Sequence, residues 1–208
     1  MRLVEKRGEV SGITSDLIFI WDQNKEYENK IFCSVICLNL SCVTTAGVTE
    51  MIVWDSGTNK KVADRIYVSD ATGGEMTVPW GSPTITDRNF TRALKDSIVN
   101  SGLCESVTAN VNEDWTLNAA IMKLDNPSFG VMDFTHKLTV RYILRNKGVS
   151  VFNEVIEAQG IGKFSDQRVA LYRAQMATEA AAQESIRKFL SELEKKLNLK
   201  SGKSKFSK

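Results

Sequence analysis

The chain has 208 residues, 42% of them hydrophobic and 25% charged, which suits one globular domain with short appended segments. Lys and Arg number 27 against 25 Asp and Glu, so the formal charge of +2 gives no overall electrostatic basis for binding nucleic acid. The single histidine, His136, leaves little material for a conventional triad or a His-rich metal site. Cys33, Cys37 and Cys42 follow a C-x3-C-x4-C spacing that matches none of the common zinc or iron–sulfur patterns. We therefore expect neither a metal nor a cofactor.

An uncharged run from Ile31 to Leu40 dominates the first part of the chain. As a helix it would rise about 15 Å, roughly half a bilayer core, so it is too short to span a membrane. It has the length of the hydrophobic region of a signal peptide, and we interpret residues 1–42 as a leader. The alternative is a buried strand, in which Cys33 and Cys37 are small core hydrophobes.

The end of this run resembles a bacterial lipoprotein leader, in which a small residue precedes the cysteine that becomes the lipidated first residue of the mature protein. Ser41 and Cys42 match that pattern, and Leu40 is acceptable before them. Asn39 departs from it, since the pattern has an aliphatic residue there, and a leader of about forty residues is long. The resemblance implies a lipid on Cys42.

Residues 43–64 are interpreted as a tether and connecting stretch, because small polar residues follow Cys42. A short strand at 66–68 comes next, followed by a turn in which Gly73 and Gly74 can take positive φ. The following helix has Thr86 or Asp87 as its cap. Its apolar residues recur every four positions, at Phe90, Leu94 and Ile98.

Alternating apolar residues then predict a strand at 115–124 and a hairpin at 138–158, with its turn at residues 146–148. A long amphipathic helix is expected from about 166 to 197, and residues 200–208 form a basic tail. The helix carries one apolar stripe: Val169, Tyr172, Met176, Ala180, Ile186, Leu190, Leu193 and Leu197. Residues 65–199 are thus predicted to form an α+β two-layer sandwich, with an antiparallel sheet covered on one face by a short helix and a long C-terminal helix.

This body also resembles a family of uncharacterised bacterial envelope lipoproteins over about 130 residues. The resemblance implies a periplasm-facing domain tethered by a lipid to a membrane, the outer membrane being favoured, with no established reaction. The residues that carry it are the GGE-x-T-x-P-W segment at 73–80, residues 90–94, Gly102-Leu103, residues 124–130, Arg141-Tyr142, Arg173, Ala177, Glu179, Ala180, Ile186 and Phe189.

Three loop aromatics, Trp80, Phe129 and Phe134, are the candidate interaction surface, since aromatic side chains are favoured anchors at interfaces. The alternative is that they plug the open end of the core. His136 is interpreted as a polar residue at a sheet edge. A nucleophile pair with Cys104 would require two distant segments to meet.

We therefore expect a lipid-anchored protein that is not an enzyme and that docks onto other envelope proteins in a transport or secretion assembly. The alternative is a ligand-binding accessory of a lipid or solute transporter. That function needs an open pocket between the helices and the sheet, for which the expected lining is Phe90, Leu94, Tyr142 and Met176.

Overall fold

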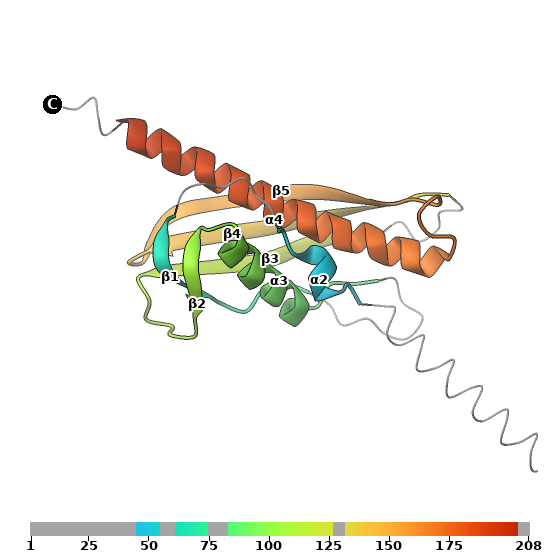
Figure 1. Ribbon diagram of the computed structural model, residues 1–208, viewed down its shortest axis with the longest axis horizontal. Coiled ribbons are helices and arrows are strands. Elements are labelled where there is room, and N and C mark those ends of the chain that lie inside the picture. The colour runs from blue at the N-terminus through green and yellow to red at the C-terminus, as the bar shows by residue number, and fades with distance from the viewer. Residues whose placement is uncertain (1–44, 55–60, 75–82, 127–131, 204–208) are drawn as a thin grey trace, which may run out of the picture. The chain divides into compact units, whose positions relative to one another are not determined.

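The computed structural model of the chain describes residues 45–54, 61–74, 83–126 and 132–203, and side chains as far as residue 197 (Figure 1). These residues belong to one compact unit, Val43–Lys208. The expected leader and the loop residues Trp80 and Phe129 lie outside the described residues.

Five strands form one sheet in the order β2-β1-β3-β4-β5. Strand β1 runs parallel to both of its neighbours, whereas β3, β4 and β5 are antiparallel. Their bounds are β1 Ala63–Val68, β2 Cys104–Thr108, β3 Trp115–Asp125, β4 Phe134–Asn146 and β5 Val149–Gly162. The predicted α+β class is confirmed, but the sheet is mixed rather than antiparallel.

The difference comes from β1, which is parallel to both β3 and β2. The short edge strand β2 was not predicted from the sequence. Its five residues include the exposed Glu105 and Ser106, so it shows no clean alternation of apolar and polar side chains. The helix α3 connects β1 to β2, and a helical crossover of this kind joins parallel strands.

Three helices are described: α2 at Val48–Met51, α3 at Asp87–Asn100 and α4 at Ala170–Lys203. The cap of α3 is Thr86, whose hydroxyl accepts a hydrogen bond from the Asn89 amide at 3.2 Å. The predicted stripe of this helix is confirmed, because Phe90, Leu94 and Ile98 are fully buried.

The long helix α4 lies along β4 and β5, as Figure 1 shows. Its predicted core face is right for Ile186, Leu190 and Leu193, which are fully buried. It is wrong for the first turns of the helix, where small residues contact the sheet instead. Tyr172 and Met176 are 41% and 37% exposed, and Val169, just before the helix, is 51% exposed. The buried residues here are Ala174, Ala177 and Ala181.

The core lies between the helices and one face of the sheet. Every second residue of β4 from Phe134 to Leu144 is buried, and Tyr142 stacks on Phe189 of α4 with ring centroids 4.5 Å apart. The opposite face carries Arg141 and Arg145, both exposed, as the alternation predicted.

Candidate functional site

The first described residues, 45–54, pack into the domain, and we call them the connecting segment. The Ala46 amide donates to the Thr84 carbonyl at 3.0 Å, and the Asn89 side chain donates to the Ala46 carbonyl at 2.9 Å. Its buried side chains are Ala46, Met51, Ile52 and Val53. This part of the expected tether at 43–64 is therefore an integral part of the fold.

Glu179 of α4 fixes the start of the connecting segment. Its Oε1 accepts hydrogen bonds from the Gly47 amide at 2.7 Å and from the Gln175 side chain at 2.8 Å. The carboxylate is 6% exposed, and burial raises its pKa, with a smaller contribution from the charge of Glu50. The two hydrogen bonds act in the opposite direction, because they stabilise the charged form.

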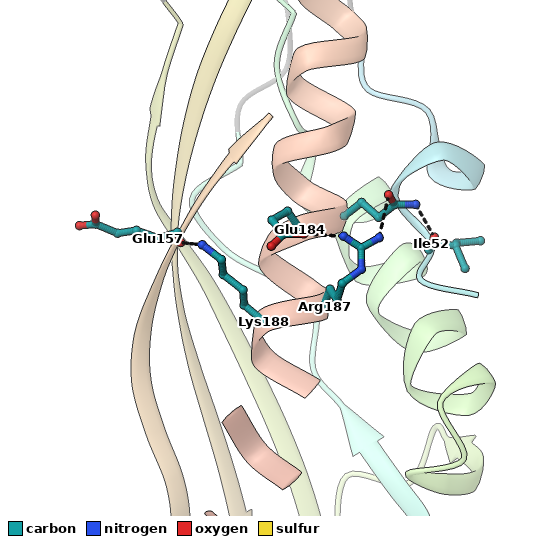
Figure 2. A network of polar contacts seen from close by, with 6 residues as sticks. Ile52, Glu157, Glu184, Arg187 and Lys188 are labelled. Atoms are coloured by element: carbon teal, nitrogen blue, oxygen red, sulfur yellow. Dashed lines mark hydrogen bonds and ion pairs between the residues drawn. The ribbon is translucent and has the colours of Figure 1, made fainter. Parts of the chain in front are cut away.

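The second half of the segment is held by α4 and α3. The Gln183 side chain donates to the Ile52 carbonyl at 2.9 Å and contacts Arg187, which also pairs with Glu184 (Figure 2). The Val53 amide donates to the buried Ser97 hydroxyl at 2.9 Å. This anchoring was missed from the sequence, although the apolar run at 51–53 is a signal of burial.

The glycine turn after β1 is also fastened to α3. Gly73 has a φ of 86°, in the region that favours glycine. The Gly74 amide donates to the Asp87 carboxylate at 2.6 Å, and the Ala71 amide donates to the Thr91 hydroxyl at 2.7 Å. These contacts give the Gly73-Gly74 pair a role in joining β1 to α3.

Of the predicted contact surface, only Phe134 is described, and it is buried. It is 8% exposed, packs with Ala174 and Ala177, and lies 5.4 Å from the Arg173 guanidinium carbon. Phe134 is therefore packed in a small buried cluster, which agrees with the alternative interpretation. The proposed role of Trp80 and Phe129 stays a prediction.

Arg173 and Glu179 are two of the residues that carry the predicted resemblance. Both are buried, with separate partners. Arg173 donates to the carbonyls of Gln167 and Arg168 just before α4, at 3.0 and 2.6 Å. It thereby secures the loop that leads into the helix.

His136 and Cys104 are not brought together. His136 lies on β4, and its Nδ1 is 2.8 Å from the Thr178 hydroxyl oxygen. The Thr178 hydroxyl donates its own hydrogen to the Ala174 carbonyl. In this contact, His136 Nδ1 is therefore protonated and donates to the Thr178 oxygen. Burial lowers the pKa of His136 to about 4. Cys104 begins β2, three strands away in the sheet, and burial raises its pKa to about 11.

The pocket expected between helices and sheet is not formed by the residues assigned to it. Phe90, Leu94 and Tyr142 are fully buried in the core cluster, and the Tyr142 hydroxyl lies 3.0 Å from that of Ser185. Met176 lies outside the core and is 37% exposed. Phe90, Leu94 and Tyr142 fill the space between the helices and the sheet. These residues therefore do not form the open pocket that would have favoured a ligand-binding accessory.

No family model and no curated protein matches this sequence. Solved structures do. A Xanthomonas campestris protein with the family designation DUF330 matches with a TM-score of 0.50 at 8% identity, over 67% of this chain and 87% of that one. A putative lipoprotein from Caulobacter crescentus gives 0.39 at 18% identity, over 54% and 83%, and a minor lipoprotein from Acinetobacter baumannii 0.37 at 11%, over 65% and 94%.

The likeness to the Xanthomonas protein concerns the fold alone. Within the described ranges, no helix combines the length and the apolar character needed to cross a membrane.

Proposed function

We propose that this chain is a lipid-anchored, non-catalytic protein of the bacterial cell envelope. Cys42 carries the lipid, and the domain faces the periplasm from a membrane, with the outer membrane favoured. The domain acts as a structural or interaction module that docks onto other envelope proteins in a transport or secretion assembly.

The observation that carries this proposal is the position of the first packed residue. Thr45 bridges to Thr84, and it follows the candidate lipidation residue Cys42 by three positions. A lipid on Cys42 would therefore hold the domain against the membrane surface, since three residues of extended chain reach only about 11 Å.

The non-catalytic part of the proposal is supported by the partners of the reactive side chains. His136 is hydrogen-bonded inside the core, Glu179 accepts from the Gly47 amide, and Cys104 is buried at the start of β2. His136 and Glu179 thus hold elements together, and Cys104 is enclosed in the core.

The test is the intact mass of the protein purified from its native membrane fraction. We expect a chain that begins at Cys42 with added acyl mass, and loss of that mass in Cys42→Ala. Cys37→Ala is the matched control, because it removes a thiol from the same stretch and leaves the lipidation residue in place. An unmodified wild-type chain that begins at Met1 would contradict the proposal.

A further inference from the structure

Five exposed apolar side chains lie at or near the connection from β5 to α4, and we call them the apolar end patch. Figure 1 shows this connection at the end of the sheet where α4 begins. The five residues are between 37% and 68% exposed: Met132, Phe164, Val169, Tyr172 and Met176. The sequence assigned Val169, just before α4, and Tyr172 and Met176 within it to the core, which does not use them.

Contacts beneath the patch hold its parts together. The Phe164 amide donates to the Asp133 carboxylate at 2.9 Å, which joins the end of β5 to the residue after Met132. The Arg173 guanidinium carbon lies 5.0 Å from the centre of the Phe164 ring, so that ring sits beside the first turn of α4. Val169, Tyr172 and Met176 follow at helical spacing and share one face of the chain.

The same part of α4 receives the connecting segment. Gly47 is bonded to Glu179, which lies one helical turn after Met176. Cys42 precedes Gly47 by five residues, so the chain limits the anchor to within about 18 Å of this point. A lipid on Cys42 would thus hold the apolar end patch close to the bilayer.

Given the proposed anchor on Cys42, we propose that the apolar end patch contacts the interfacial region of the phospholipid bilayer and sets the orientation of the domain on it. Side chains with an apolar body and a polar tip, such as Tyr172, are favoured at that depth. Lys163 and Arg168 are exposed beside the patch and can reach lipid phosphates. A group of exposed apolar side chains at one end of a domain can mark an interaction site, whereas single exposed residues are ordinary.

The test uses the protein purified from its native membrane fraction and reconstituted into phosphatidylethanolamine and phosphatidylglycerol vesicles that contain a photoreactive phospholipid. Mass spectrometry then locates the cross-linked residues and also shows whether Cys42 carries the lipid. We expect several-fold more labelling in residues 164–176 than at the opposite end of the domain. The matched comparison there is Val111 and Val149, which are 61% and 70% exposed.

Tyr172→Ser with Met176→Ser should lower labelling of residues 164–176, and Val111→Ser with Val149→Ser should leave it unchanged. Thermal unfolding checks that both double variants fold. An acylated protein with no excess labelling at the patch would overturn the membrane contact and leave the proposed anchor intact. A patch found to be covered by another protein would have the same consequence. A chain without acyl mass would overturn both proposals.

Discussion

Buried polar side chains join the long C-terminal helix to the rest of the domain. His136 meets Thr178, Tyr142 meets Ser185, and Glu179 meets the Gly47 amide, each across more than forty positions of sequence. Such pairs satisfy groups that would otherwise lose hydrogen bonds on burial, and they fix how the helix is placed.

Acid should destabilise the domain through His136. Its pKa is lowered to about 4 in the folded state against 6.5 for the free side chain, because burial disfavours the charged form. The unfolded chain therefore binds the proton first as pH falls. The resulting loss of stability develops between pH 6.5 and 4 and reaches at most about 3 kcal/mol.

Urea unfolding of wild type and His136→Gln across this pH range measures the effect. The difference between the two proteins isolates His136 from Glu179, whose raised pKa gives stability that is lost as pH rises through the folded value. Equal pH dependence in both proteins would contradict the assignment.

Removing the Glu179 carboxylate should release the connecting segment. Glu179→Ala leaves the Gly47 amide without its acceptor and is expected to cost about 1–3 kcal/mol of folding free energy. Glu179→Gln keeps an oxygen acceptor and should cost clearly less. Hydrogen exchange at the Gly47 amide should accelerate in the alanine variant, and unchanged protection there would disprove the role.

At the scale of elements, α4 lies close to β5 because both sides of the contact are small. A Cβ added at Gly160 would overlap the Ala177 carbonyl, and one at Gly162 would overlap that of Arg173. The alanines of α4 that lie opposite Gly160 have no side-chain atom beyond Cβ. Backbone therefore approaches backbone, and the helix has little room to shift.

Gly160→Ala should destabilise the domain by about 2–3 kcal/mol, because an overpacked contact forces backbone to move. Gly102→Asn is the matched control. Gly102 has a φ of 71° with open space around its Cβ position, and asparagine tolerates that conformation. Thermal melts compare the two variants, and equal shifts in Tm would rule out the close approach.

The elements that could be predicted from the sequence are those with a clear period. Phe90, Leu94 and Ile98 identified α3. The alternation in residues 138–144 identified β4 and the solvent-exposed face of the sheet. The start of α4 misled the prediction, because close packing against β5 selects alanine rather than large apolar residues. The short strand β2 carries no such pattern.

The candidate site was predictable only in part. Ser41 and Cys42 give a local pattern for lipidation, but the hydrogen bond from Gly47 to Glu179 spans 132 positions and has no local signal. Phe134 shows the same difficulty, since its burial depends on where Arg173 and the alanines of α4 lie.

At the scale of the whole molecule, β5 is a long edge strand. The Glu157 carbonyl accepts from the Lys188 side chain of α4 at 2.9 Å, as Figure 2 shows. Backbone groups in an antiparallel strand point alternately toward and away from the neighbouring strand, so those of Val155 and Gln159 also face the free edge. A lysine over such an edge opposes pairing with other chains.

Lys188→Ser should increase self-association, because it uncovers the edge carbonyl and removes a charge. Light scattering against protein concentration measures the change. Lys195→Ser is the matched control, since Lys195 pairs with Glu192 on α4 and bonds no strand. Equal association of the two variants would show that Lys188 does not guard the edge.

The packing of the connecting segment has a mechanical consequence for an anchored domain. Ala46 and Gly47 are tied to Thr84, Asn89 and Glu179 with no slack chain between them and the core. A pull applied at Cys42 would therefore meet backbone hydrogen bonds within a few residues. Tension between the membrane and a docked partner would therefore be transmitted through the folded domain itself, within a few residues of the anchor.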